Sequence, residues 1–154
     1  MRLFRLCKAR FAATGWDGEG ARRVGGRWNH RGDGVVYAAP SLALAAWETF
    51  VHVDPGLIPA DLVQLVADLP DDVSRREVAP GELPKGWNRY PGPTRLQDLG
   101  SAWIRSRETL LLVVPSAVIA DERCVLVNPG HPEFSRLVLE PPRPFAFDPR
   151  SWRR

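Results

Sequence analysis

The spacing of apolar and polar residues predicts short strands near the start of the chain. Apolar and charged side chains alternate in RLFRL, residues 2–6, which is the pattern of a half-buried strand. The glycine-rich, polar segment 13–26 predicts a loop. RWN at 27–29, HRGDG at 30–34 and VVYAA at 35–39 predict a strand, a turn and a strand, because the glycines supply the positive φ of tight connections. We therefore expect a hairpin here.

A helix is predicted directly after this hairpin. Ser41 follows a proline and is a good N-cap, so the helix is expected over residues 42–53. The sequence Asp-Pro-Gly at 54–56 should stop it. The next apolar segment, residues 61–70, suits either a short helix or a buried strand.

The middle of the chain predicts a long loop followed by a second helix. Residues 70–93 carry five prolines and three glycines, and we interpret them as a loop within one domain and a candidate lid. The segment 94–106 has helical periodicity. Thr94 and Gln97 are spaced as a capping box at its start.

The last third of the chain predicts strands. Residues 109–119 form an apolar run that Pro115 should end, and residues 123–134 predict a strand and a turn. Two short strands are expected at 136–140 and 144–148. Strands, helix, mixed segments, helix and strands in this order predict a single α+β domain, with mixed or antiparallel sheets and flanking helices, over residues 1–154.

Composition narrows the class of protein. The chain has 154 residues, 44% of them apolar, which fits one domain with a sizeable core. Its net charge of +3 is mild, so it favours anionic partners such as phosphates. The six tryptophans are not arranged with basic residues in a repeat that would stack nucleic-acid bases, and we expect no direct nucleic-acid partner.

Cysteine usage and hydropathy predict a soluble, cytoplasmic protein. Cys7 and Cys124 are far apart and show no metal-ligand spacing, so free thiols in a reducing compartment are favoured and no metal site is expected. Charges interrupt the first eleven residues, which therefore lack a signal-peptide core. The longest apolar run, LLLVVP, is too short to cross a bilayer, so no membrane partner is expected.

Glu48 is the first candidate for chemistry. It lies in the predicted helix 42–53, whose other positions are apolar nearly all round, so we expect that helix to be buried. A carboxylate in such a place is costly unless it is paired. The alternative to a catalytic role is a buried salt bridge with an arginine.

Arg27 and Tyr37 come from the two predicted strands just before that helix. Glycines precede Arg27 and allow close approach of a ligand, and an arginine can clamp a phosphate bidentately. The alternative for Arg27 is a surface arginine stacked on Trp28. Tyr37 alternates with apolar residues, and could stack on a flat ring or be a core aromatic with a satisfied hydroxyl.

These residue types together match one reaction. Ordinary glycoside hydrolysis needs two carboxylates, one of which protonates the leaving oxygen. Nicotinamide on NAD is already a cationic leaving group, so one carboxylate suffices. An arginine for the diphosphate and an aromatic for the nicotinamide complete the set.

Long stretches of the chain resemble the RES domain family. They are residues 25–52 (GGRWNHRGDGVVYAAPSLALAAWETFVH), 98–106 (DLGSAWIRS), 110–137 (LLLVVPSAVIADERCVLVNPGHPEFSRL) and 144–150 (PFAFDPR). The first stretch is the most specific. The resemblance implies a toxin of a RES–Xre toxin–antitoxin pair, with a fold similar to ADP-ribosyltransferase toxins.

The resemblance also implies site residues. It marks Arg27, Tyr37 and Glu48 as catalytic and Arg5 as a further, substrate-binding arginine. NAD is implied as the substrate rather than as a cofactor, with cleavage by a glycohydrolase or a phosphorylase. Transfer of ADP-ribose to a protein or nucleic acid, and a non-enzymatic or RNA-directed toxin, are the alternatives.

The family serine is assigned to Ser116, with Ser135 as the alternative. No base stands beside Ser116 in the sequence, so we expect it to donate a hydrogen bond, to the nicotinamide amide or to Glu48, rather than act as a nucleophile. Asn128 and His131 also resemble family residues, and a structural turn with a capping histidine is the alternative to a functional role. The implied protein partner is an Xre-family helix-turn-helix antitoxin.

Overall fold

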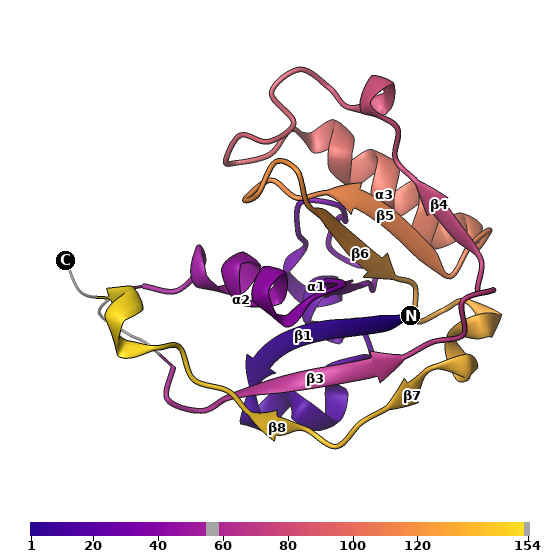
Figure 1. The fold of residues 1–154 in the computed structure, drawn as a ribbon. Helices are drawn as coiled ribbons and strands as arrows, with labels where there is room; N and C mark the ends of the chain where they lie inside the picture. The colour runs from indigo at the N-terminus through magenta and orange to yellow at the C-terminus, as the bar shows by residue number, and fades with distance from the viewer. Residues whose placement is uncertain (55–58, 153–154) are drawn as a thin grey trace.

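The computed structural model describes residues 1–54 and 59–152 (Figure 1). Its strands are β1 (Arg2–Lys8), β2 (Val36–Ala38), β3 (Leu62–Asp68), β4 (Arg75–Glu77), β5 (Leu111–Pro115), β6 (Arg123–Val127), β7 (Val138–Leu139) and β8 (Arg143–Pro144). Its α-helices are α1 (Glu19–Val24), α2 (Leu42–Phe50) and α3 (Thr94–Ser106). Short 3-10 helices are η1 (Ala9–Thr14), η2 (Pro80–Glu82), η3 (Pro132–Arg136) and η4 (Pro149–Trp152).

The strands form two small sheets. In the first sheet β1 pairs with β3, and β3 also pairs with β7 and β8. The second sheet has the order β2-β6-β5-β4, in which β4 runs parallel to β5 while the other pairs are antiparallel. Figure 1 shows the two sheets facing each other, with α3 along the outer side of the second sheet. The predicted α+β fold with mixed sheets is confirmed.

Two layers of core side chains hold this arrangement together. Leu3 and Leu65 of the first sheet pack against Val36 and Val125 of the second sheet. On the other face of the second sheet, a further buried cluster joins the strands to α3; it includes Trp28, Leu96, Trp103, Leu112, Val114 and Leu126. The alternation of side chains along each strand divides them between the two layers.

The helix that carries Glu48 begins where the sequence predicts and ends earlier. Ser41 caps α2, since its side chain accepts a hydrogen bond from the backbone N–H of Leu44 at 3.1 Å. The helix ends at Phe50 rather than at Val53. Residues 55 and 56 of the predicted stop lie outside the described residues.

The second predicted helix has the predicted bounds, but its predicted cap is wrong. The N-cap of α3 is Pro93, which makes no side-chain cap bond. Gln97 instead donates from Nε2 to the backbone oxygen of Gly26 at 2.9 Å. The side chain that was expected to close the helix therefore ties α3 to the turn before Arg27.

The predicted hairpin of 27–29 and 35–39 is wrong. Gly26 and Asn29 form an isolated bridge inside a turn, and β2 pairs with β6 instead. The reason is that side chains take over the hydrogen bonds of a partner strand. Asn29 Nδ2 donates to the backbone oxygens of Ala21, His30 and Asp33, at 3.0, 3.0 and 2.9 Å.

The segment 13–26, predicted as a loop, contains the short helix α1. Glu19 accepts hydrogen bonds from Arg22 and Arg23, three and four residues later, and Asp17 accepts one from the backbone N–H of Glu19 at 2.8 Å. Local ion pairs and this acceptor stabilise a turn of helix among glycines that pattern analysis assigns to a loop.

Strand pairing decides the secondary structure of the remaining segments. The segment 61–70 contains the strand β3, which is antiparallel to β1. The segment 70–93 contains β4 and η2 between its turns. The strand predicted at 144–148 is wrong for residues 145–148, since β8 is Arg143–Pro144. No helix within the described part of the chain is long and apolar enough to span a membrane.

Candidate active site

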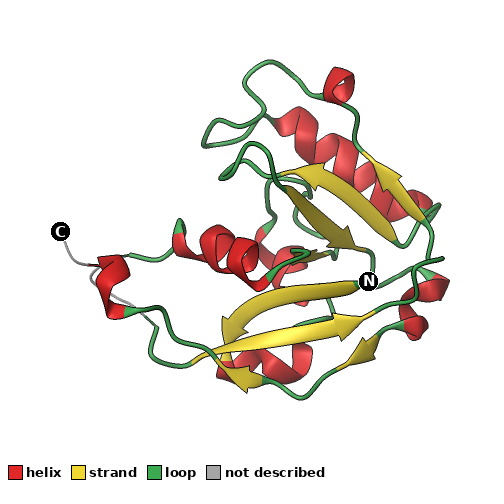
Figure 2. Cartoon of the chain, in the orientation of Figure 1, coloured by secondary structure: helices red, strands yellow, loops and turns green. Residues whose placement is uncertain are grey.

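Glu48 lies on a helix that is open on one side. Figure 2 shows α2 at one side of the molecule, next to β1. Leu44 and Ala45 face the protein, but Trp47 is 52% exposed and Val51 is 49% exposed. The expectation of a helix buried nearly all round is therefore wrong, because on this face Phe50 packs edge to face against Phe147 while Trp47 and Val51 stay about half exposed.

Two neutral donors hold the Glu48 carboxylate. Ser116 Oγ donates to Glu48 Oε1 at 2.6 Å, and Cys124 Sγ donates to the same oxygen at 3.1 Å. Within residues 1–54 and 59–152, Glu48 forms no ion pair, so the structure does not show the salt bridge that was the alternative. Neutral donors orient a carboxylate without cancelling its charge.

Ser116 is aligned for this bond by the loop after β5. It is buried, and its Oγ accepts hydrogen bonds from the backbone N–H groups of Val118 at 3.1 Å and Ile119 at 2.9 Å. With these acceptor positions used, the hydroxyl proton points to Glu48. Ser135, the alternative family serine, is exposed and donates to the backbone oxygen of Pro132 at 3.1 Å. Ser116 is therefore the serine that lies beside Glu48.

Cys124 was not among the predicted site residues. Burial raises the pKa of its thiol, and the negative charge of Glu48 raises it further, so the thiol keeps its proton at neutral pH. The sequence contained one indication of its place. Alternation along RCVLV puts Cys124 on the same strand face as Leu126.

Tyr37 lies on that same face of the second sheet. It is directly paired with Leu126 of β6, and Cys124 lies two residues along that strand. Diagonal neighbours of this kind are about 7–8 Å apart in a sheet. The structure thus brings Tyr37 near the thiol that binds Glu48, although no hairpin does so.

The hydroxyl of Tyr37 is occupied by protein partners. It donates to Asn29 Oδ1 at 2.8 Å and accepts from the backbone N–H of Trp28 at 2.9 Å. Burial raises the pKa of Tyr37 above its usual range. Gly26 permits this arrangement, since a Cβ there would stand 2.5 Å from the Tyr37 hydroxyl. The structure therefore shows Tyr37 with a satisfied hydroxyl, as in the alternative interpretation of a core aromatic residue.

Arg27 points toward the loop that precedes α3. Its Nη1 donates to the backbone oxygens of Trp87 at 2.7 Å and Arg89 at 2.9 Å. Gly92 also lies against it, since a Cβ there would be 2.8 Å from Nη1. No stacking of Arg27 on Trp28 is found in the described residues. The positive charge of Arg27 acts to lower the pKa of Tyr37, but the opposing effect of burial is larger.

Arg5 approaches Tyr37 from the first sheet. Its Nη1 donates to the backbone oxygen of Tyr37 at 2.8 Å. Its Nε is buried and has no hydrogen-bond partner among the described residues. Burial lowers the pKa of Arg5, the expected direction for a desolvated cation. Arg5 therefore contacts Tyr37 from β1, whereas Arg27 comes from the turn before β2 and binds the loop before α3.

Asn128 and His131 build a turn rather than join this group. Asn128 Nδ2 donates to the backbone oxygen of Ile104 at 2.9 Å, and its Oδ1 accepts from Gly130 N–H at 3.0 Å. His131 caps η3, because its Nδ1 accepts from the backbone N–H of Glu133 at 3.1 Å. Both residues therefore match the alternative prediction of a structural turn with a capping histidine.

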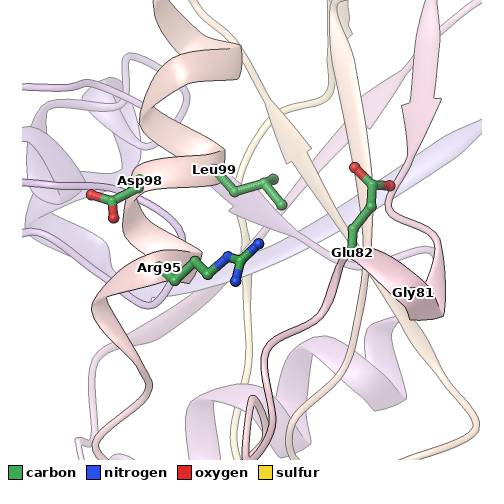
Figure 3. Close-up of a pocket in the computed structure, with 5 residues that line it drawn as sticks. All are labelled: Gly81, Glu82, Arg95, Asp98 and Leu99. Atoms are coloured by element: carbon green, nitrogen blue, oxygen red, sulfur yellow. The ribbon is translucent and has the colours of Figure 1, made fainter.

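A hollow lies elsewhere on the surface. It has a volume of about 540 Å³ and lies between η2 and α3, where Figure 3 shows Glu82 and Arg95 on opposite walls. None of the predicted site residues lines it. Its lining residues are Gly81, Glu82, Arg95, Asp98 and Leu99. We therefore place the candidate site at Glu48 and Tyr37 and not in this hollow.

The fold and the Glu48–Ser116 pair define the class of protein. The family profile "RES domain" matches residues 2–148, so the chain belongs to the RES domain family. It is 35% identical over 151 residues to "Toxin Res" of Yersinia enterocolitica, covering 97% of this chain and 99% of that protein. It is 40% identical over 146 residues to the "Prs ADP-ribosylating toxin" of Sphingobium sp., covering 94% and 91%. The chain thus belongs to a family whose relatives are named as toxins.

A solved structure supports the fold assignment. A chain in the crystal structure of the M. tuberculosis MbcT-MbcA toxin–antitoxin complex matches 98% of this chain and 86% of its own length, with a TM-score of 0.70. Its sequence identity is 19%, so the similarity concerns the fold.

Proposed function

We propose that this toxin breaks the bond between nicotinamide and ribose in NAD, with Glu48 stabilising the positive charge that develops on the sugar. The observation that carries the proposal is the hydrogen bonding of Glu48. Ser116 and Cys124 both donate to Oε1, which orients the carboxylate and leaves its negative charge intact. Fixed charges aimed at developing charge are usually the largest catalytic term.

One carboxylate is sufficient for this chemistry. When the C1′–N bond breaks, its electron pair returns to the pyridinium nitrogen, and nicotinamide leaves as a neutral molecule without protonation. The remaining cationic sugar is then captured by an acceptor oxygen. Glu122 influences Cys124 electrostatically, but its side chain is exposed and no hydrogen bond joins it to Glu48 within the described chain. The arrangement does not suit the two-carboxylate mechanism of ordinary glycosidases.

The other predicted residues receive roles that fit their places. We assign the diphosphate to Arg27 and Arg5, because an arginine suits a phosphate and Arg5 already donates to the backbone oxygen of Tyr37. We assign the ring of Tyr37 to packing near the nicotinamide, because its hydroxyl is occupied by Asn29 and Trp28. Ser116 orients Glu48.

Product analysis tests the proposal directly. Purified protein is incubated with NAD labelled on the adenine, and free nicotinamide and labelled products are measured. Release of nicotinamide is expected, with ADP-ribose as product if water is the acceptor and a phosphorylated ADP-ribose if phosphate is. No nicotinamide release under any of these conditions would contradict the proposal and favour a non-enzymatic or RNA-directed toxin.

Transfer of ADP-ribose to a protein is a second candidate function at the same site. The Sphingobium relative is named for ADP-ribosylation, and its 40% identity extends over 94% of this chain. The exposed apolar residues Trp47 on α2 and Val51, which directly follows α2, would offer contact area to a protein acceptor next to Glu48. In the same assay, label retained on a macromolecule identifies transfer, whereas label in a small product identifies hydrolysis or phosphorolysis.

We also propose a cognate antitoxin of the Xre-like helix-turn-helix type. The fold is that of a chain solved in a toxin–antitoxin complex, and an enzyme that drains NAD needs restraint in its host. An antitoxin that covers the candidate site should insert a carboxylate or a C-terminus, because Arg5 and Arg27 suit anions. Expression of the chain alone should arrest growth and lower cellular NAD, and co-expression of the antitoxin should restore both. Normal growth and NAD levels with wild-type chain alone would contradict this.

A further inference from the structure

Glu48 accepts a hydrogen bond from a second donor besides Ser116. Cys124 Sγ lies 3.1 Å from Glu48 Oε1, the same oxygen that accepts from Ser116 Oγ at 2.6 Å. The thiol comes from β6, whereas Ser116 follows β5. Two neighbouring strands therefore each contribute one donor to a single carboxylate oxygen.

The thiol is in the right state and place to donate. Its pKa is raised by burial and by Glu48, so it carries its proton at neutral pH. Its backbone is fixed by the pairing of Cys124 with Val114 of β5. Its side chain packs against the two buried clusters that contain Leu126 and Leu44. Because the sheet and the two clusters hold the thiol in place, the thiol cannot move with the carboxylate. The carboxylate must therefore orient toward the thiol.

The second oxygen of Glu48 is left open. Oε2 makes no hydrogen bond with the described residues, and it does not belong to the buried atoms that lack a partner, so it reaches solvent. The terminal torsion of a glutamate is broad, and one donor would leave the carboxylate free to swing about that bond. A second donor on the same oxygen, from another direction, restricts that rotation.

We propose that Cys124 is a positioning residue, which acts together with Ser116 to turn Glu48 so that Oε2 faces the sugar carbon of the substrate. This inference rests on the proposed function of Glu48. A pre-oriented carboxylate needs no reorganisation when charge develops, so the loss of the thiol should affect the chemical step and leave substrate binding nearly unchanged.

The test compares cysteine variants in the nicotinamide-release assay. Cys124→Ala removes the donor and should lower kcat about 10-fold or more, with KM within about 2-fold of wild type, as expected for a lost hydrogen bond to a charged group. Cys124→Ser replaces the thiol by a hydroxyl donor and should recover most of kcat. Cys7→Ala is the control for removal of a thiol, because Cys7 is the other free cysteine and lies on β1.

A second pair of variants guards against a folding defect. If Cys124→Ala does not fold, as judged by thermal melting, Cys124→Thr and Cys124→Val are compared, since they have the same shape and only threonine donates. A higher kcat for threonine supports the inference. Equal kcat values for threonine and valine would overturn it.

The remaining outcomes separate this inference from the proposed function. If Cys124→Ala keeps the wild-type kcat while Glu48→Gln is inactive, the positioning role is wrong and the function of Glu48 stands. A rise in KM at unchanged kcat would also overturn the positioning role. If Glu48→Gln releases nicotinamide like wild type, the proposed function itself is wrong.

Discussion

Two polar groups of the candidate site, Glu48 on α2 and Tyr37 on β2, are held in opposite ways. Glu48 receives two donors on Oε1 and keeps Oε2 open. The Tyr37 hydroxyl has both its donor and its acceptor function used, by Asn29 and by Trp28. The Glu48 region retains hydrogen-bonding capacity toward a ligand, whereas the Tyr37 hydroxyl has none to spare.

This difference indicates that Glu48 is available for chemistry, whereas the Tyr37 hydroxyl serves the fold. Tyr37 organises the turn that carries Arg27, so its hydroxyl acts within the protein. Glu48 also differs from an ordinary surface glutamate on a helix. Glu19 is neutralised by Arg22 and Arg23, which lower its pKa to about 2. An ionic partner would weaken the field of Glu48 at a cationic sugar, and neutral donors avoid this.

The largest expected effect is that of Glu48→Gln. The glutamine oxygen can still accept from Ser116 and Cys124, so the fold should be retained, while the negative charge is lost. We expect nicotinamide release to fall roughly 100- to 1000-fold, the scale for removal of one electrostatic stabiliser. Thermal melting provides the control. A variant with a much lower melting temperature that still cleaves NAD would mean that Glu48 serves the fold, as the Tyr37 hydroxyl does.

Arg27→Lys should have the next largest effect. Lysine keeps the charge but loses the fork that can hold a diphosphate and the two carbonyls at once. We expect kcat/KM for NAD to fall about 10- to 100-fold, as for lost hydrogen bonds to a charged group. Steady-state kinetics measures this, with Arg10→Lys on the exposed surface as the matched control. Equal kcat/KM in both variants would remove Arg27 from the site.

Tyr37→Phe should mainly affect stability. It leaves the backbone N–H of Trp28 and the Oδ1 of Asn29 without their partner, so the free energy of unfolding should fall by about 1–3 kcal/mol. If the ring is what contacts the substrate, kcat should stay within about 10-fold of wild type. Tyr37→Ala should be worse in both measurements. Activity as low in Tyr37→Phe as in Tyr37→Ala would mean that the hydroxyl takes part in the reaction.

The smallest effect is expected at a carboxylate that serves the fold alone. Glu133 lies on η3 and has no hydrogen bond to Glu48, Ser116 or Cys124 among the described residues. Hydrogen bonds from Ser74 and Arg136 lower its pKa below the ordinary 4.5. The unfolded chain therefore takes up a proton on this group before the folded chain does as pH falls. The stabilisation is present above about pH 4.5 and is lost as pH falls toward the folded pKa.

Glu133→Gln should remove this pH dependence. Urea unfolding of wild type and variant should differ at neutral pH and converge at acid pH, while NAD turnover at neutral pH stays the same. A loss of turnover in folded Glu133→Gln would show that the division between architecture and chemistry is not as local as the Glu48–Tyr37 comparison indicates.

Local patterns determined the elements whose boundaries depend on neighbouring residues. Helical periodicity predicted α3 with its observed bounds, and the cap at Ser41 placed the start of α2. The sequence also pointed to a hydrogen-bonding role for Ser116, and the structure shows its bond to Glu48. Helix periods and caps act over a few residues, so they can be found in the sequence itself.

Tertiary structure decided which strands pair and which side chains form hydrogen bonds with each other. The hairpin expected before β2 does not form, because Asn29 and Gln97 satisfy the backbone of the turn and β6 takes the place of the partner strand. The bond of Cys124 to Glu48 spans 76 residues of sequence, and that of Ser116 spans 68. Contacts between residues so far apart depend on strand order and register, which are selected by the packing of the whole core and leave no local pattern.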